Sequence, residues 1–408
     1  MNIYQVGGAI RDRLLGITQK DRDYVVTGAT PEQMATMGYL PIGKDFPVFL
    51  HPKSKQEYAL ARTERKTARG YAGFSFNTDP AITIEQDLSR RDLTINAIAE
   101  DQDGNLIDPF NGQQDIKDRV LRHVSDAFVE DPVRVLRVAR FAARFSHLGF
   151  TLAAETRSLI TAIGESGELD ALVPERVWSE MYKALAEQDP QVFFTTLRDC
   201  QVLNILFPEI NDLFGVPQTA KYHPEVDTGI HLMLCLKKAA ELDFDNEVRF
   251  AVLTHDLGKA STPKEILPGH HGHERRGVKL TQAFCKKWRA PKNCTELAVM
   301  TCEYHTHIHR MYELKPATIL KLFSQTDIYR RPERFIKMTQ ACVADARGRT
   351  GFESDPYPQA DYACRLAKQI NGLDLTSVIN SGTKGSELGQ AIYQHRLEHL
   401  KTLIEKPD

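Results

Sequence analysis

The stretch that decides the fold lies near the start of the chain and reads Val6-Gly7-Gly8-Ala9-Ile10-Arg11-Asp12, followed by Lys20-Asp21-Arg22-Asp23-Tyr24-Val25-Val26. The apolar residues before the glycines predict a short strand over 3–6, and the spacing after them predicts a helix over 9–16. A second strand is expected to continue from the aspartates. This alternation is typical of a mixed α/β domain.

Asp21 and Asp23 are two residues apart, so on a strand both side chains point to the same face. Two carboxylates this close repel each other unless a cation or an arginine lies nearby. Mg²⁺ suits such a pair because it prefers oxygen ligands and leaves room for water and phosphate. Because Asp-x-Asp is a common pattern, the pair alone favours a solvated turn. The glycine turn, whose backbone can approach phosphate, and Arg11 instead favour nucleotidyl transfer with catalytic Asp21 and Asp23.

Two later segments add candidate residues to this site. In Arg90-Arg91-Asp92-Leu93-Thr94-Ile95-Asn96, Asp92 and Asn96 form an i,i+4 pair on an expected helix. Arg91, at the start of that helix, is suited to bind a triphosphate in a bidentate manner, although a basic surface helix start would look the same. Glu57 lies on a strand expected to pair beside the aspartates, where it is either a third carboxylate or a surface residue.

The most informative helix begins at Glu130-Asp131-Pro132-Val133-Arg134, with Pro132 at its first position and Asp131 as its cap. Its arginines fall within an arc of about 120°, and apolar residues occupy the other side; they are Arg134, Arg137, Arg140 and Arg144. An arginine stripe is usually solvated, but a solvated stripe normally includes Lys and Glu. Four arginines without a lysine indicate planar recognition of phosphate or base edges.

The composition bounds the class of protein. The 408 residues suffice for two to four domains, with 42% hydrophobic and 26% charged residues. A net charge of −2 provides no global attraction for nucleic acid, so any RNA binding must come from local basic patches. Seven scattered cysteines, an odd number without a CxxC pair, argue against a disulfide framework. With no signal segment or membrane-length apolar run, we expect a cytoplasmic protein.

The residue patterns predict an α+β protein with four parts. Residues 1–125 form an α/β head, with a hairpin of strands at 47–50 and 57–61 and a loop over 62–76. Residues 126–215 form a helical neck and body, with helices at 132–146, 152–164, 174–187 and 190–201. Residues 216–350 are helical and rich in histidine, and residues 351–408 form a helical tail that ends in a helix near 385–405. The last three parts are therefore expected to be all-α.

A second group of chemistry-bearing residues lies in the histidine-rich part, where nine of the fourteen histidines fall between His223 and His309. A polar His255-Asp256 pair within an apolar helix is poorly explained by packing. Together with His231 and Asp345 it supplies two imidazoles and two carboxylates, a suitable set for a divalent transition metal. His231 alone would be interpreted as a core histidine. The roles of the other histidines stay open, and they are His270, His271, His273, His305, His307 and His309.

The motifs Gly7-Gly8-x-x-Arg11-Asp12, Asp21-x-Asp23, Arg90-Arg91-Asp92-x-Thr94-x-Asn96-Ala97 and Glu130-Asp131-x-x-Arg134 closely resemble those of the bacterial class II tRNA nucleotidyltransferases, the CCA-adding enzymes. The later histidines and aspartates resemble the HD domain (named for its His-Asp pair) of the multifunctional CCA type. Essentially the whole chain is covered. The resemblance implies a nucleotidyltransferase head followed by neck, body and tail, and CCA addition to tRNA from CTP and ATP. Thr306 stands where the family has an aspartate, so the role of that aspartate is in doubt here.

The resemblance also implies roles for individual residues. Asp21 and Asp23 would bind catalytic Mg²⁺, and Asp131 with Arg134 would serve as a protein template for the incoming base. The expected ATP- and CTP-binding residues are Gly8, Arg11, Arg91, Arg137 and Arg140. The HD residues His231, His255, Asp256 and Asp345 would hold Ni²⁺ or another divalent transition metal. The HD domain would then act as a 2′,3′-cyclic phosphodiesterase, 2′-nucleotidase and phosphatase.

The template role agrees with the chemistry of the bases. Cytosine and adenine both show an amino donor beside a ring nitrogen acceptor, so one carboxylate and one guanidinium can pair with either. Uracil and guanine show the opposite order and would leave buried groups unpaired, at about 1–3 kcal/mol each. We therefore expect Asp131 and Arg134 to select C and A over U and G.

Three other classes compete with a CCA-adding enzyme. A bacterial poly(A) polymerase shares the head motifs, but an intact HD pair and the lack of a long basic tail argue against it. A regulatory protein uridylyltransferase also joins these domains, yet residues 351–408 leave little room for its sensing modules. A non-catalytic RNA-binding module is least favoured because the catalytic residues are in place. The expected partners are the acceptor stem and 3′ end of tRNA, for a monomer or homodimer.

Overall fold

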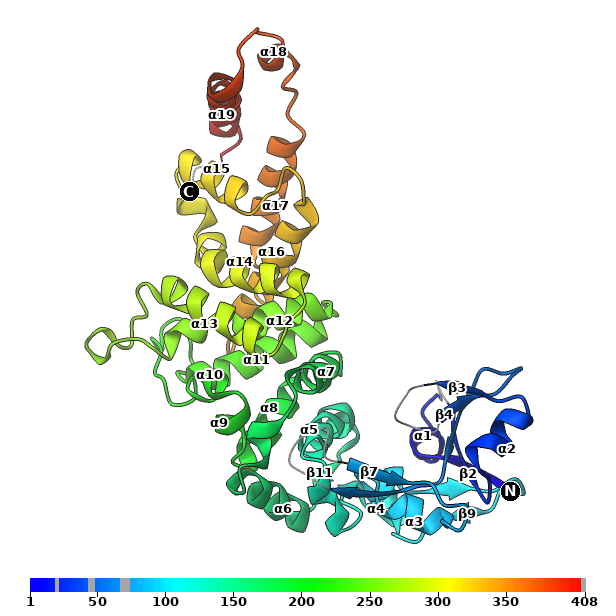
Figure 1. Cartoon of the computed structure of the whole chain (residues 1–408). Coiled ribbons are helices and arrows are strands. Elements are labelled where there is room, and N and C mark those ends of the chain that lie inside the picture. Colours follow the sequence, from blue (N-terminus) through cyan, green and yellow to red (C-terminus); the bar gives the residue numbers. More distant parts are fainter. Residues whose placement is uncertain (19–21, 43–47, 67–73, 405–408) are drawn as a thin grey trace. The chain divides into compact units, whose positions relative to one another are not determined.

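The computed structural model describes residues 1–18, 22–42, 48–66 and 74–404 (Figure 1). The chain divides into two compact units, the first made of Met1–Ala184 and Val192–Leu206 and the second of Leu185–Gln191 and Phe207–Asp408. The chain therefore passes between the units three times. The first unit holds the predicted head and most of the predicted neck, so the division into four parts stays a prediction.

The first unit is built on a seven-stranded sheet in the order β3-β4-β5-β2-β1-β8-β9. Its strands are β1 (Asn2–Val6), β2 (Asp23–Thr27), β3 (Leu40–Ile42), β4 (Val48–Leu50), β5 (Glu57–Leu60), β8 (Ala99–Glu100) and β9 (Leu106–Ile107). β1 and β2 are antiparallel, as are β4 and β5, which confirms the predicted hairpin. β2 and β5 are parallel, with Asp23 opposite Glu57.

The strand β2 lies in the middle of this sheet and has a hydrophobic cluster on each face. Val25 belongs to one hydrophobic cluster, with Val6 and Leu88, whereas Val26 belongs to the other, with Met34 and Leu60. Successive side chains of a strand point to opposite faces, which explains the division. Only the first residue of the strand, Asp23, is exposed. The sheet core therefore fixes the position of this carboxylate.

Two expectations about the head were wrong. Within the predicted loop 62–76, β6 (Thr63–Lys66) and β7 (Phe74–Asn77) pair as antiparallel strands. The glycines and basic residues conceal the pairing because they show no alternating pattern. Arg91 does not begin a helix, since α3 (Ile84–Ser89) ends before it and only a 3₁₀ turn follows, Thr94–Asn96. Another small sheet pairs β10 (Val120–Leu121) with β11 (Thr151–Leu152).

The helices of the first unit confirm the periodicity of the sequence, including the four predicted between 132 and 201. Besides α3 they are α1 (Gly8–Leu14), α2 (Pro31–Thr36), α4 (Gly112–Asp118), α5 (Val133–Phe145), α6 (Ala154–Glu165), α7 (Pro174–Leu185), α8 (Gln191–Asp199) and α9 (Leu203–Leu206). Asp131 caps α5 as expected, because its Oδ1 accepts a hydrogen bond from the Val133 amide at 3.1 Å.

The second unit is helical throughout the part that the structure describes. Its helices are α10 (Pro208–Asn211), α11 (Thr228–Glu241), α12 (Asn246–Thr254), α13 (His273–Lys287), α14 (Lys292–His309), α15 (Pro316–Gln325), α16 (Pro332–Arg347), α17 (Pro358–Asn371), α18 (Thr376–Ile379) and α19 (Gly385–Leu403). α12 packs against α11, α14 and α16, and α13 packs against α14. The α+β class is confirmed, and none of the described helices is both long and apolar enough to cross a membrane.

Candidate functional sites

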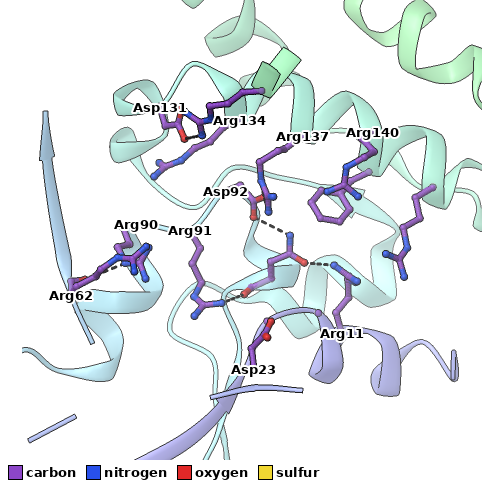
Figure 2. A pocket seen from close by; sticks show the side chains of 16 residues that line it. Arg11, Asp23, Arg62, Arg90, Arg91, Asp92, Asp131, Arg134, Arg137 and Arg140 are labelled. Atoms are coloured by element: carbon purple, nitrogen blue, oxygen red, sulfur yellow. Dashed lines mark hydrogen bonds and ion pairs between the residues drawn. The ribbon is translucent and has the colours of Figure 1, made fainter. Parts of the chain in front are cut away.

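A cavity of about 490 Å³ in the first unit gathers most of the head and neck residues singled out in the sequence (Figure 2). Among the residues that the structure describes, sixteen line this cavity; nine of them are arginines and none is a lysine or a glutamate. The arginines are Arg11, Arg62, Arg90, Arg91, Arg134, Arg137, Arg140, Arg144 and Arg176. Three aspartates also line it, Asp23, Asp92 and Asp131. Planar, permanently charged side chains at this density suit a polyphosphate ligand.

The glycine turn makes room for two of these arginines. Gly7 has a φ of +71°, which favours glycine, and a Cβ there would lie 3.0 Å from Arg91 Nη1. A Cβ on Gly8 would lie 3.3 Å from Arg11 Nη2. The amide of Gly7 donates to the carbonyl of Ile98 at 3.3 Å. Both glycines line the cavity, but the amide of Gly7 is already used within the fold.

The carboxylate edge of the cavity is formed by β2. Asp23 lines the cavity and is exposed at the start of the strand. The parallel register with β5 places exposed Glu57 beside Asp23, as the sequence predicted. Asp21 lies outside the described residues. Two carboxylates from neighbouring strands supply the oxygen ligands that Mg²⁺ prefers, so these residues fit that ion.

Asp92 and Asn96 join the head to α5. Asn96 Nδ2 donates to Asp92 Oδ1 at 2.9 Å, and its Oδ1 accepts from Arg11 Nη1. Arg137 Nε donates to Asp92 Oδ2 at 2.8 Å. Burial works to raise the pKa of Asp92, but Arg137 and Asn96 outweigh it and hold that pKa well below its usual range. Asp92 therefore stays ionised and orients Arg137 toward the cavity.

The four arginines of the α5 stripe line the cavity, which argues against the alternative of a solvated face. Arg134 is only 5% exposed, and its Nη1 donates to the Ala127 carbonyl at 2.5 Å. Arg140 Nε donates to Glu180 Oε2 at 2.6 Å, and Arg144 Nη2 lies 3.1 Å from Asp12 Oδ2. Charged partners on other elements thus hold the arginines in place around the cavity.

Asp131 has a partner that the sequence did not reveal. Arg176, on α7, donates Nη1 to Oδ1 at 3.1 Å and Nη2 to Oδ2 at 2.7 Å, a bidentate pair. Arg176 and Glu180 lie one turn apart on α7, and both contact residues of the α5 region. That i,i+4 pair was the available signal, but it is common on surface helices.

The second unit brings together the four HD residues predicted from sequence. His231 lies on α11, His255 at the end of α12 and Asp345 on α16, with Asp256 next in the chain. His231 Nε2 is 3.0 Å from Asp345 Oδ1, and His255 Nε2 is 3.6 Å from Asp345 Oδ2. All four are buried. Ligand atoms of His231, His255 and Asp256 lie within 4.8 Å of one another, and Asp345 forms another such group with His255 and His305.

Some of the histidines left open by the sequence join this cluster and others do not. His273 Nε2 lies 3.3 Å from Asp256 Oδ1 and 3.1 Å from His305 Nε2. His309 Nε2 lies 2.7 Å from Asp345 Oδ2 and its Nδ1 is 2.7 Å from the Tyr357 hydroxyl. In contrast, His270 contacts Thr262 and the Pro217 carbonyl, and His307 lines a different cavity.

The buried cluster leaves polar atoms without hydrogen bonds of acceptable geometry among the described residues. They are His255 Nε2 and both carboxylate oxygens of Asp256. Lys259 Nζ lies 2.7 Å from Asp256 Oδ2 as an ion pair. Burial opposes the charged form of His255, yet Asp256 and Asp345 raise its pKa above the ordinary value. Orphaned buried atoms of this kind are costly, and a divalent cation would satisfy them.

Residues around the cluster orient its ligands. Glu225 Oε1 lies 2.9 Å from His231 Nδ1 and 3.2 Å from His223 Nδ1. A carboxylate on Nδ1 fixes the ring so that Nε2 faces Asp345. The sequence pattern did not identify Glu225, because its contact is defined only by the folded turn before α11.

Comparisons with known proteins identify three domains along the chain. Residues 3–122 match the family described as Poly A polymerase head domain, and residues 149–214 match the probable RNA and SrmB-binding site of polymerase A. Residues 228–334 match the HD domain. The chain is therefore a nucleotidyltransferase joined to an HD phosphohydrolase domain.

Full-length relatives define the family more closely. The chain is 56% identical over 403 residues to the multifunctional CCA protein of Thioalkalivibrio sulfidiphilus, covering 99% of this chain and 98% of the relative. It is 55% identical over 407 residues to that of Pseudomonas fluorescens, covering all of both chains. The chain belongs to the family of multifunctional CCA proteins.

Solved structures support the fold. A CCA-adding enzyme in its apo form II has a TM-score of 0.67 at 19% identity, covering 100% of this chain and 89% of that one. The Bacillus stearothermophilus CCA-adding enzyme in complex with CTP has a TM-score of 0.64 at 21% identity, covering 99% and 90%. The Thermotoga maritima enzyme complexed with tRNA has a TM-score of 0.62 at 19% identity, covering 100% and 88%.

Proposed function

We propose that the arginine cavity of the first unit is where this enzyme adds C, C and A to the 3′ end of tRNA from CTP and ATP. The observation that carries the proposal is that nine arginines and the strand carboxylate Asp23 line one cavity. The 3′ hydroxyl oxygen of the RNA attacks the α-phosphorus of the nucleotide. The bond from that phosphorus to the β-phosphate oxygen breaks, the hydroxyl proton leaves, and pyrophosphate departs.

Asp21 and Asp23 are proposed to hold Mg²⁺, which when bound activates the attacking hydroxyl and stabilises the leaving pyrophosphate. Glu57, beside Asp23 in the parallel register, is the candidate for a third carboxylate. The proposed ATP- and CTP-binding residues are Gly8, Arg11, Arg91, Arg137 and Arg140. Their guanidinium groups are oriented in advance by Asp12, Asn96, Asp87, Asp92 and Glu180. Such preorganisation reduces the entropy lost when a triphosphate binds.

Asp131 and Arg134 are proposed to read the base, with the carboxylate accepting from the amino group and the guanidinium donating to the ring nitrogen. Asp131 also forms an ion pair with Arg176. Because each carboxylate oxygen has more than one acceptor site, Arg176 can hold the carboxylate in place while the base binds. Selection of C and A over U and G then depends on all three residues.

The buried cluster of the second unit is proposed to hold Ni²⁺ or another divalent transition metal through His231, His255, Asp256 and Asp345. When bound, the metal lowers the pKa of water and polarises the phosphoester. In hydrolysis, the water oxygen bonds to phosphorus, the ester P–O bond breaks, and the departing alcohol oxygen takes a proton. The proposed substrates are 2′,3′-cyclic nucleotides, 2′-nucleotides and other phosphomonoesters.

The first function is tested with tRNA that lacks its terminal CCA, incubated with labelled CTP and ATP. We expect ordered addition of two C and one A, and no incorporation from UTP or GTP. Long A tails would instead indicate a poly(A) polymerase, and labelled protein would indicate a protein-modifying enzyme. The variant pair Asp131→Ala and Arg134→Ala tests base reading. An unchanged preference for C and A over U and G would refute the assigned role.

The second function is tested with a nucleoside 2′,3′-cyclic phosphate and enzyme loaded with Ni²⁺. We expect hydrolysis that disappears on chelation and in His255→Ala. CCA addition by His255→Ala in Mg²⁺ serves as the control for folding, because His255 lies in the other unit. Hydrolysis that survives this substitution would refute the assigned cluster.

A further inference from the structure

A separate cavity of about 320 Å³ opens in the second unit beside the HD cluster. Several of its lining residues belong to or touch that cluster, including His273 and Lys259. His273 lies 3.3 Å from Asp256 Oδ1, and Lys259 Nζ lies 2.7 Å from Asp256 Oδ2. A ligand in this cavity would therefore have one end beside the buried carboxylate. Its volume is at the lower end of the range for small-molecule sites.

Gln218 lines this cavity and has a donor group that the fold does not use. The side chain is only 3% exposed, and its Oε1 accepts a hydrogen bond from Lys259 Nζ at 2.6 Å. Because lysine can only donate, this contact fixes which end of the amide is oxygen. The amide nitrogen, Nε2, has no hydrogen-bond partner among the described residues. A buried amide donor without a partner is costly, which indicates that a ligand acceptor completes it.

The backbone holds Gln218 firmly in this place. The backbone N–H of Gln218 donates to the Val226 carbonyl at 2.6 Å. Next to it, Pro217 and Asp227 form an antiparallel bridge. The ring of His270 links two segments near Gln218, because it lies 2.8 Å from Thr262 Oγ1 and 3.1 Å from the Pro217 carbonyl. Burial lowers the pKa of His270 to about 4, so this ring is neutral and adds no charge.

The charged residues that line the cavity are two cations, Lys259 and Arg310, and one carboxylate, Glu274. Lys259 lies at the cluster end, and Arg310 at the rim pairs with Glu313 at 2.8 Å. The carboxylate of Glu274 accepts from the Thr306 hydroxyl at 2.8 Å and lies 3.5 Å from His273 Nδ1. An anionic group is thus favoured at the Lys259 end. Tyr222, which is 55% exposed, provides an aromatic side chain elsewhere in the lining.

We propose that this cavity is the substrate subsite of the HD domain, that it takes the nucleoside end of a nucleotide phosphoester, and that Gln218 Nε2 donates a hydrogen bond to an oxygen of its sugar–phosphate. The ester lies toward Lys259 and Asp256, and the base stacks on Tyr222, since any base offers a face to an aromatic ring. The inference rests on the proposed phosphohydrolase function. Gln218 is a binding residue and does not ligate the metal.

Gln218 has two separable roles, because Nε2 can donate to a ligand and Oε1 accepts from Lys259. Two substitutions distinguish them. Gln218→Glu keeps an oxygen that accepts from Lys259 but removes the donor. Gln218→Met is close in size and removes both. We expect each to raise KM for a nucleoside 2′,3′-cyclic phosphate about tenfold or more, with kcat within about threefold. Gln325→Glu, an exposed glutamine of the same unit, is the matched control and should leave KM unchanged.

Further measurements exclude an indirect effect. The affinity of Gln218→Met for Ni²⁺, measured by calorimetric titration, should equal that of the unsubstituted protein. Tyr222→Ala should raise KM for the cyclic nucleotide but not for p-nitrophenyl phosphate, which has no nucleoside. A KM for Gln218→Glu equal to that of the unsubstituted protein would overturn the donor role. Ni²⁺ affinity that falls as far as substrate affinity in Gln218→Met would overturn the subsite.

The subsite and the proposed hydrolysis can fail independently. Binding of 2′-AMP, measured by calorimetry on the full chain, requires no turnover. If the unsubstituted protein fails to hydrolyse the cyclic phosphate, the proposed hydrolysis fails. Weaker 2′-AMP binding by Gln218→Met but not by Gln325→Glu would still support the subsite. Equal binding by the unsubstituted protein and Gln218→Met would overturn it.

Discussion

The two proposed sites of this chain would handle phosphate with opposite chemistry. The first-unit cavity is lined by nine arginines, whose charge does not change at physiological pH. The second-unit cluster consists of buried imidazoles and carboxylates, whose charge depends on a metal and on protons. The first site suits a highly charged triphosphate that must be held in register. The second suits a single phosphoester that must be attacked by water.

The comparison shows how each site is kept ready. The arginines of the first site are oriented by carboxylates and Asn96 from other elements, so the cavity is organised without a ligand. The HD cluster instead retains orphaned atoms at His255 and Asp256. A cation bound there would satisfy these atoms. Substitutions should therefore separate the two activities.

Asp23→Asn should break the first site and spare the second. The substitution keeps the shape of the side chain but removes the charge proposed to hold Mg²⁺, so we expect CCA addition to fall about 10³-fold. Hydrolysis of a cyclic phosphate should be unchanged. Initial rates of both reactions on one preparation provide the measurement. A parallel loss of both activities would show that the substitution damages the fold.

Asp345→Asn should have the converse effect. Asp345 contacts His231, His255 and His309. Loss of its charge should therefore weaken the proposed metal binding and the contacts that hold the three imidazoles. We expect phosphohydrolysis to fall about 10²-fold, with CCA addition retained. Asp374→Asn, an exposed carboxylate in the same unit, is the control. Unaltered hydrolysis would mean that Asp345 is not a ligand.

Glu225→Gln tests the orientation of His231. The substitution weakens the carboxylate contact to Nδ1, so the affinity for Ni²⁺ should fall about tenfold. Calorimetric titration of the metal-free protein measures this directly, and Glu353→Gln serves as an exposed control. An affinity equal to that of the control would show that the ring is oriented by other contacts.

Arg176→Gln tests whether Arg176 supports base reading by Asp131, and its expected effect is small. Removing the bidentate partner leaves Asp131 in place through its cap on α5 but less firmly oriented. We expect discrimination of CTP against UTP to fall about threefold, because partly exposed ion pairs contribute little. Ratios of kcat/KM for the two nucleotides provide the measurement. The exposed Arg157→Gln variant should keep the original ratio.

Much of the fold could be predicted because the relevant patterns are local. The apolar residues after Asp23 predict the strand β2, and the three-to-four spacing of apolar residues predicts the helix α5. Two consecutive glycines indicate the turn before α1. β6 and β7 could not be predicted, because their basic and glycine-rich surroundings carry no alternation. The position of Arg91 was also misjudged, since the segment from Arg90 to Asn96 depends on contacts with α5 and on a bridge between Leu93 and His123.

The supporting residues of both sites were missed for one reason. Arg176 lies 45 residues from Asp131, and Gln218 lies 41 residues from Lys259. Neither residue type nor local spacing indicates such partners. The residues predicted correctly to come together are those whose chemistry is unusual for their setting, such as His255-Asp256 in an apolar helix. Glutamine and arginine on ordinary surfaces carry no comparable signal.

Because the chain passes between the two units three times, they cannot be separated by one cut. A stop codon or protease cut after Ala184 leaves Val192–Leu206 of the first unit on the other fragment, and one after Leu206 leaves Leu185–Gln191 on the wrong side. No single break yields two intact halves. Separating the activities physically would require excising and rejoining segments, so point substitutions are the cleaner tool. The same interleaving means that a truncation that keeps one unit whole also keeps a short segment of the other, Leu185–Gln191 or Val192–Leu206.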